Sequence, residues 1–93
     1  MNRSFKHRGL KRFWESSDLS GIPAVFQKRI RRQLDALDQA LKPQDLTDLP
    51  GYKVHPLKGQ FAGRYAMSVS GNLRMTFGWD RIDAIDIDLE DYH

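Results

Sequence analysis

The sequence predicts an α+β protein in which two N-terminal helices pack on one face of a mainly antiparallel, four-stranded sheet. Apolar residues recur at helical spacing in the first part of the chain and alternate with polar residues from Tyr52 onward. Turn residues then divide the second part into short segments. With 93 residues the chain has room for one modest core, so we expect a single domain over residues 1–93.

The first helix is expected from His7 to Ser16. Leu10, Phe13 and Trp14 recur there at the i, i+3 and i+4 positions of one helix face. Lysine and arginine occupy the other faces, so the helix is short, amphipathic and basic. A stretch of serine, aspartate and glycine ends it.

The second helix has the clearest pattern in the sequence. Pro23 suits its first turn, where the missing N–H has no helical partner anyway, and Pro43 stops it. Its apolar residues step by three or four positions and form one buried stripe: Phe26, Ile30, Leu34, Leu37 and Leu41. Basic residues surround this stripe.

Four strands are expected near residues 52–57, 64–70, 73–78 and 84–89, and their short connections favour an antiparallel meander. Alternation places one set of side chains under the helices: Tyr65, Met67, Val69, Leu73, Met75, Phe77, Trp79, Ile85, Ile87 and Leu89. The opposite set lies on an uncovered face: Lys53, His55, Arg64, Ser68, Arg74, Thr76, Asp86 and Asp88. This second face is rich in cations.

Charge is distributed unevenly along the chain. Residues 1–32 contain nine lysines or arginines against two carboxylates, whereas residues 80–93 contain six carboxylates against one arginine. A basic region of this kind favours nucleic-acid binding, although a solvated helix face is the simpler alternative. The chain has no cysteine and no long apolar run, so we expect a cytoplasmic protein without a membrane partner.

His55 and Lys58 are the first candidate catalytic residues. His55 ends a predicted strand, and its imidazole can move a proton near neutral pH. Lys58 precedes a turn glycine and can hold a phosphate as a point charge. A histidine at a strand end is more often structural, so that alternative stays open.

Arg74 is expected to project from the uncovered face, because its neighbours Leu73 and Met75 point to the core. Its guanidinium can bind a phosphate through two hydrogen bonds. Alternatively, it forms a salt bridge with Asp86 or Asp88 on a neighbouring strand.

A metal site is the competing enzymatic hypothesis. Asp86, Asp88 and Glu90 alternate on one strand and offer oxygen ligands for Mg²⁺. Alternation on a solvated strand gives the same spacing without function, and the three histidines lack the spacing of metal ligands. Phosphate-binding glycine loops and dinucleotide fingerprints are also absent from the sequence, so we expect neither a metal nor a cofactor.

The last residues, Asp91, Tyr92 and His93, follow the final strand without a linker. Chain ends usually fray. Here the preceding strand is expected to hold them against the sheet, where an acid, a phenol and an imidazole can transfer protons and stack on a base.

Four blocks of the sequence form a recognisable series: Ser4-Phe5-Lys6-His7 with Gly9-Leu10-Lys11, then His55-Pro56-Leu57-Lys58-Gly59, then Gly71-Asn72-Leu73-Arg74-Met75-Thr76-Phe77, and Glu90-Asp91-Tyr92-His93. In order and spacing they resemble the HigB toxins of the RelE superfamily, over nearly the whole chain. Leu73 replaces an expected tryptophan, and Ser70 stands where some relatives have a basic residue.

The resemblance implies a compact RelE-like fold and a toxin of a type II toxin-antitoxin system. Such toxins enter the A site of the 30S ribosomal subunit, contact 16S rRNA and cut mRNA, and a HigA-like helix-turn-helix antitoxin silences them. Operator DNA is then bound only through the antitoxin. Carried onto this sequence, the resemblance implies a catalytic set of His55, Lys58, Arg74, Asp91, Tyr92 and His93. RNA is expected to contact Lys6, Arg8, Lys11, Arg12 and Arg64.

In this scheme proton transfer and base stacking are carried out by His55, Asp91, Tyr92 and His93. Lys58 and Arg74 stabilise phosphate charge without a metal. Which residue acts as the base stays open. Two alternatives remain at this point. One is a ParE-like toxin of similar fold that poisons DNA gyrase without cutting RNA, and the other is a non-catalytic RNA- or ribosome-binding module.

Overall fold

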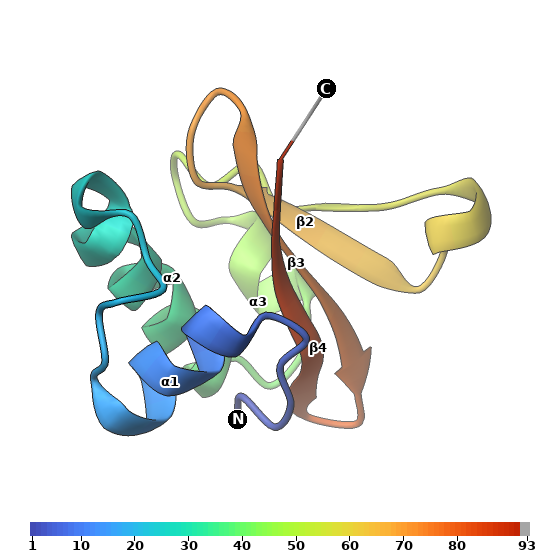
Figure 1. Cartoon of the computed structure of the whole chain (residues 1–93). Coiled ribbons are helices and arrows are strands. Elements are labelled where there is room, and N and C mark those ends of the chain that lie inside the picture. Colours follow the sequence, from blue (N-terminus) through green and yellow to red (C-terminus); the bar gives the residue numbers. More distant parts are fainter. Residues whose placement is uncertain (92–93) are drawn as a thin grey trace.

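The computed structural model describes residues 1–91, with helices on one side of a four-stranded sheet (Figure 1). Along the chain the elements are α1 (Arg8–Ser16), the 3₁₀ turn η1 (Ala24–Phe26), α2 (Gln27–Gln39), α3 (Gln44–Thr47), β1 (His55–Pro56), the 3₁₀ turn η2 (Gly59–Phe61), β2 (Arg64–Ser68), β3 (Leu73–Asp80) and β4 (Asp83–Asp91). The sheet order is β1-β2-β3-β4, and every neighbouring pair is antiparallel. The predicted α+β class and meander are therefore confirmed.

Side-chain and backbone caps determine where α1 begins and ends. His7 precedes the helix, and its Nδ1 accepts the N–H of Leu10 at 3.1 Å, which satisfies one of the free donors of the first turn. Ser17 ends the helix with a left-handed φ of 56°, and its N–H donates to the Phe13 carbonyl at 3.1 Å.

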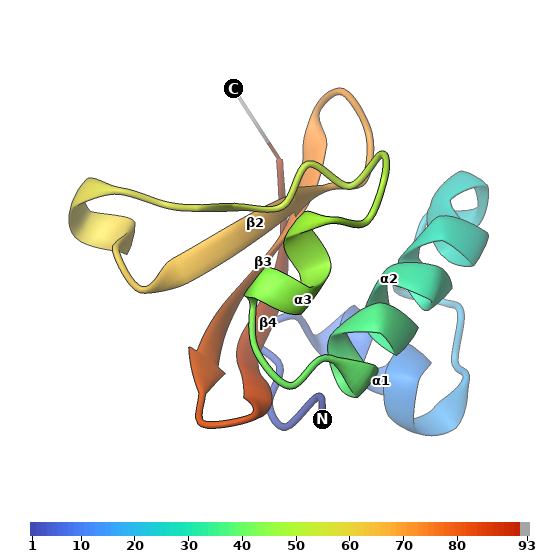
Figure 2. The same ribbon diagram turned by 180° about the vertical axis from the view of Figure 1, so that it is seen from behind.

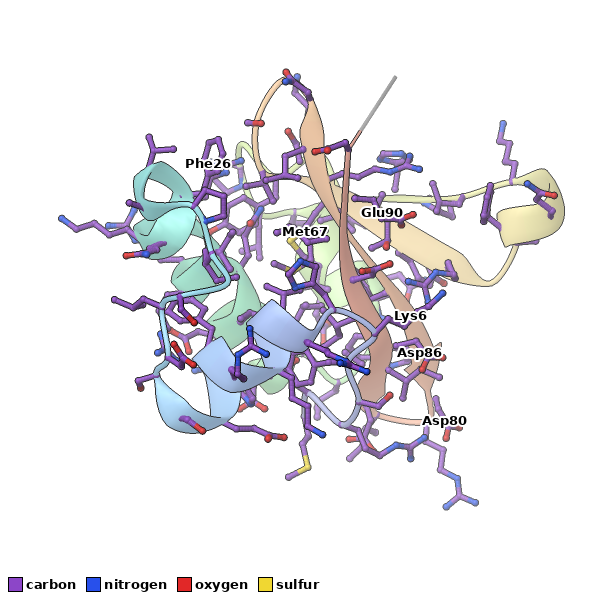
Figure 3. All side chains as sticks on the ribbon, in the orientation of Figure 1. Lys6, Phe26, Met67, Asp80, Asp86 and Glu90 are labelled. Atoms are coloured by element: carbon purple, nitrogen blue, oxygen red, sulfur yellow. The ribbon has the colours of Figure 1, made fainter. Side chains whose placement is uncertain are left out.

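The core lies between the helices and the sheet. Figure 3 shows Met67 of β2 in this space, and Figure 2 shows α2 and α3 on the same side of the sheet. The largest fully buried apolar side chains come from both layers: Leu10, Ile30, Leu34, Leu37, Leu46, Met67, Met75, Phe77 and Ile87. Within residues 1–91, no helix is long and apolar enough to cross a membrane.

The prediction for Leu41 was wrong. α2 ends at Gln39, and Ala40 turns to an extended conformation with a ψ of 139°. Leu41 therefore leaves the helical stripe and is 64% exposed. The short α3 supplies the buried Leu46 in this part of the core, which the helical spacing alone did not predict.

The prediction that Ile85 faces the core was also wrong, because β4 contains a bulge. The register shifts between Thr76 and Gly78 of β3, and Asp86 opposite them has a left-handed φ of 49°. One extra residue in a strand reverses the face of everything beyond it. Ile85 therefore lies against Gly78 on the far side of the sheet, and Ala84 is buried in the core instead.

The N-terminal segment adds a partner to the edge of β4. Parallel bridges join Asn2 to Ala84 and Phe5 to Ile87. Arg3 also forms ion pairs with Asp80 and Asp83 at the β3–β4 turn. Part of the basic N-terminal region thus neutralises part of the acidic C-terminal region, an internal pairing that the separate charge counts did not reveal.

Candidate active site on the open face of the sheet

The side of the sheet away from the helices is called the open face here. The strand register assigns ten residues to it: His55, Arg64, Ala66, Ser68, Arg74, Thr76, Gly78, Ile85, Asp88 and Glu90. Figure 3 shows Glu90 on this side of β4. The open face therefore carries two arginines, a histidine and two carboxylates over four adjacent strands.

A hydrogen-bond chain crosses the middle of the open face. Nη2 of Arg64 donates to Oγ1 of Thr76 at 3.1 Å and to the backbone oxygen of Asp86 at 2.9 Å. The Thr76 hydroxyl in turn donates to Glu90 in a short hydrogen bond. Thr76 is fully buried although its strand face is uncovered by helices. One hydroxyl therefore links a guanidinium to a carboxylate, and both charged groups are held in fixed positions.

Arg74 lies next to this chain in the centre of the sheet. The register places it between Ser68 on β2 and Glu90 on β4, and Arg74 is partly buried. Directly opposed residues of an antiparallel pair have Cβ atoms about 4.5–5.5 Å apart. The carboxylate opposite Arg74 is therefore Glu90, and neither Asp86 nor Asp88 occupies that register position.

His55 lies at the edge of the open face, on β1 opposite Ala66, and it is exposed. Its Nδ1 is 2.8 Å from the carbonyl oxygen of Lys53. A carbonyl oxygen only accepts, so Nδ1 carries the proton and Nε2 of the neutral ring is a proton acceptor. Strand spacings place the Cα atoms of His55 and Arg74 about 12 Å apart, a gap that their side chains shorten.

Other members of the predicted catalytic set lie outside this cluster. Lys58 is exposed and begins the turn η2 between β1 and β2. Asp91 pairs with Leu73, so it is one residue out of phase with the open face. Tyr92 and His93 lie outside the described residues. The cluster on the open face is thus only part of the predicted set.

The predicted RNA-binding cations are divided between two parts of the molecule. Arg64 belongs to the open face, whereas three others are exposed on α1 in the helix layer: Arg8, Lys11 and Arg12. Arg12 is also 3.5 Å from Asp18 in an ion pair. Lys6 lies beside β4, where its backbone N–H donates to the Ile87 oxygen at 2.8 Å, and Figure 3 shows it near Asp86.

The three carboxylates of the alternative metal site have separate neighbours. Asp86 lies beside the Ser4 hydroxyl, Asp88 accepts the backbone N–H of Leu89 and Glu90 accepts the Thr76 hydroxyl. Among residues 1–91, no three histidine, aspartate or glutamate side chains are grouped to hold a metal ion. This geometry gives the Mg²⁺ hypothesis no support.

The sequence model of the HigB-like toxins, described as RelE-like toxins of type II toxin-antitoxin systems, matches residues 3–93. The chain belongs to this family. The match confirms the predicted HigB-type toxin, and a type II toxin has an antitoxin as its partner.

Two relatives agree with this assignment, and one solved structure has a similar fold. "Endoribonuclease HigB" of Proteus vulgaris is 42% identical over 93 residues and covers both chains completely. "Toxin HigB-1" of Vibrio cholerae serotype O1 is 30% identical over 80 residues, covering 85% of this chain and 84% of the relative. The YoeB dimer structure from Staphylococcus aureus has a TM-score of 0.57 at 20% identity, covering 100% of this chain and 97% of that chain, which supports the fold.

The link between Thr76 and Glu90 was missed by sequence reasoning, which treated Thr76 as one polar residue among several and Glu90 as a possible metal ligand. Strand alternation contained part of the signal, because Thr76 is in phase with Arg74, and Glu90 with Asp88. The bond itself depends on the register between β3 and β4, which no local pattern defines.

Proposed function

We propose that this chain is a ribosome-dependent endoribonuclease that cuts mRNA without a metal and thereby inhibits translation. The observation that carries the proposal is the contact of His55 Nδ1 with the Lys53 carbonyl, which leaves Nε2 as a proton acceptor on the same face as Arg74. The name of the 42% identical relative, an endoribonuclease, supports the same reaction class.

In the proposed reaction, Nε2 of His55 accepts the proton of a ribose 2′-hydroxyl as its oxygen attacks the adjacent phosphorus. Arg74 donates hydrogen bonds to the phosphate oxygens, where negative charge increases in the transition state. The bond from phosphorus to the 5′ oxygen breaks, and that oxygen takes a proton. The products are a 2′,3′-cyclic phosphate and a free 5′-hydroxyl.

The remaining roles follow from the family resemblance. Asp91 and His93 are proposed to complete proton transfer to the leaving oxygen, and Tyr92 to stack on an unpaired base. Lys58, from the loop between β1 and β2, adds a cation for the phosphate backbone.

The shape of the molecule favours a substrate that is positioned from outside. A hollow in the described chain lies in the helix layer, away from the open face, and is lined by Ala36, Gln39, Ala40, Asp45, Leu46 and Leu49. The open face itself is the surface of a sheet. Correct alignment of the 2′-hydroxyl and phosphate is a large part of catalysis, and we propose that the ribosomal A site provides it.

The same proposal defines the partners. The exposed cations of α1, together with Lys6, are proposed to contact 16S rRNA of the 30S subunit. The antitoxin is proposed to be a HigA-like helix-turn-helix protein that binds operator DNA. Because the proposed target is the ribosome, we propose that the toxin acts in the cytoplasm.

The decisive experiment replaces Arg74 with alanine. We expect single-turnover cleavage of mRNA on ribosomes to slow by about 10²–10³, because that is the usual cost of removing one transition-state donor. Arg32→Ala removes the same charge from an exposed position on α2 and serves as the control. Cleavage at the wild-type rate by folded Arg74→Ala protein would refute the assigned role.

Two further conditions separate this mechanism from its alternatives. Cleavage is expected to continue in excess EDTA when a polycation keeps the ribosomes intact. If EDTA instead stops cleavage, and added Mg²⁺ alone restores cleavage of RNA without ribosomes, a metal-dependent nuclease would be favoured. Growth arrest without new transcript 5′ ends would instead favour a gyrase poison or a non-catalytic binding module.

A further inference from the structure

The middle of the chain is basic in sequence, and the carboxylates that lie beside it in the sheet come from β4. Between Asp48 and Asp80 the sequence contains no aspartate or glutamate, and it contains four cations: Lys53, Lys58, Arg64 and Arg74. This region includes β1, β2, most of β3 and the loop that joins β1 to β2. β1 lies at the edge of the sheet opposite β4, so the loop that carries Lys58 is well separated from these carboxylates. A cation at this edge favours a polyanionic partner.

The loop between β1 and β2 is held by its own backbone hydrogen bonds. The Leu57 N–H donates to the Arg64 oxygen at 2.8 Å and closes the base of the loop. At its tip, the Phe61 N–H donates to the Lys58 oxygen at 3.3 Å. Figure 1 shows this loop extending away from the helices on the far side of the sheet. The loop is therefore a defined projection of the molecule.

Phe61 is exposed at the tip of this projection. Its exposed fraction is 47%, and it is not among the side chains that pack against the core. Gly59 and Gly63 flank it with left-handed φ values of 65° and 94°, and the space around both glycines is open. The two glycines allow a tight turn that presents the aromatic ring to solvent.

We propose that Phe61 stacks on an unpaired base of the RNA substrate while Lys58 binds a neighbouring phosphate. An exposed aromatic ring beside a cation, at the sheet edge opposite the acidic strand β4, is a combination that binds single-stranded nucleic acid, because every base has a face for stacking. The proposal rests on the proposed function, since it assumes that RNA is the substrate.

The position of the loop indicates which part of the RNA it contacts. Lys58 is five residues along the strand direction and two strands away from Arg74, so strand spacings place their Cα atoms about 20 Å apart, a gap that their side chains shorten. The stacked base is therefore several nucleotides away from the phosphate that is cut. A contact at this distance anchors the flanking single strand and affects binding more than the chemical step.

The test measures binding of the full chain to a short single-stranded oligoribonucleotide without secondary structure, by fluorescence anisotropy at fixed salt. Phe61→Leu keeps an apolar side chain and removes the ring, so we expect binding about fivefold to a hundredfold weaker. Phe61→Tyr keeps the ring and should bind as the wild type does. Ile82→Ala, at another exposed apolar position, is the matched control and should leave affinity unchanged.

A second readout detects stacking directly. Phe61→Trp adds an indole to those of Trp14 and Trp79. The emission that it adds over the wild-type chain should be quenched when the single-stranded RNA binds, but much less with duplex RNA of equal length. Unchanged affinity of Phe61→Leu together with unquenched Phe61→Trp would overturn the proposal. That result would leave the proposed function intact if Arg74→Ala still slowed cleavage on ribosomes.

The same variants distinguish the substrate from other sources of contact. An effect of Phe61→Leu that appears only with ribosomes lacking mRNA would assign the contact to ribosomal RNA and overturn the proposal. If Phe61→Leu lost antitoxin binding but kept its RNA affinity, the proposal would also be overturned, and the contact would be assigned to a protein partner.

Discussion

Replacing Thr76 with valine tests the hydrogen-bond chain that organises the open face. The substitution keeps the shape of this fully buried side chain but removes its hydroxyl, and with it one bond from Arg64 and one to Glu90. Hydrogen bonds to charged groups contribute about 1.5–3 kcal/mol each. Arg64 keeps its bond to the Asp86 oxygen, and Glu90 is partly exposed and can be hydrated. We therefore expect Thr76→Val to lower the free energy of unfolding by about 2 kcal/mol, which is less than the sum of the two hydrogen bonds.

The assay is equilibrium unfolding in urea, with the free energy of unfolding compared at equal slope. A loss of this size lowers the melting temperature by about 10 °C in a domain of this length. Thr76→Ser is the matched variant, because it keeps the hydroxyl and loses only a methyl group, a cost of about 1 kcal/mol. The expected order of stability is wild type, then serine, then valine.

A double-mutant cycle isolates the bond to Glu90. Thr76→Val and Glu90→Ala are expected to be non-additive by about 1 kcal/mol, because each removes the same contact. Additive effects of the two substitutions, with valine as stable as the wild-type threonine, would refute the structural link between the hydroxyl and the carboxylate.

Three other outcomes are expected. Gly9→Ala lowers stability by about 1–3 kcal/mol in urea, because a Cβ there meets a backbone oxygen of the next loop at 2.8 Å, and an unchanged midpoint would contradict this close approach. The Ser20 backbone N–H lowers the pKa of Asp18 from its ordinary 3.8, so the stabilisation is present above pH 3.8 and is lost as the pH falls through the lower folded pKa. The melting temperature of Asp18→Asn should therefore fall less steeply with decreasing pH than that of the wild type. An equal dependence on pH in both proteins would exclude the effect. Deleting His93 is expected to slow cleavage by about 10²–10⁴, and Tyr92→Ala to weaken substrate binding, without a change in melting temperature in either case. Cleavage at the wild-type rate by the chain without His93 would show that the terminus is not part of the active site.

Local periodicity was enough to predict the layers of this fold. The spacing of Leu10 and Phe13 and of Ile30, Leu34 and Leu37 follows the helical repeat, and these side chains are buried in the structure. Alternation likewise placed Met75 and Phe77 correctly, because residues two apart on a regular strand share a face. The family resemblance also depended on short blocks in fixed order, which the sequence shows directly.

Part of the candidate site was also accessible from the sequence. Arg74 lies between two core-facing neighbours, so its direction followed from alternation, and His55 was recognised at the end of a strand. Lys58 was a candidate because it precedes a turn glycine, although the structure places this lysine in the loop and away from Arg74.

Tertiary structure alone decided the features that depend on pairing between distant segments. The bulge at Asp86 moved Ile85 to the open face, because alternation holds only while a strand stays regular. The register of β3 and β4 brought Glu90 to Thr76, and the N-terminal segment joined β4 through residues more than 80 positions away in the chain. Local spacing therefore determined which residues are buried in regular elements. The contacts between those elements, which position the charged groups of the open face, depend on packing of the whole chain.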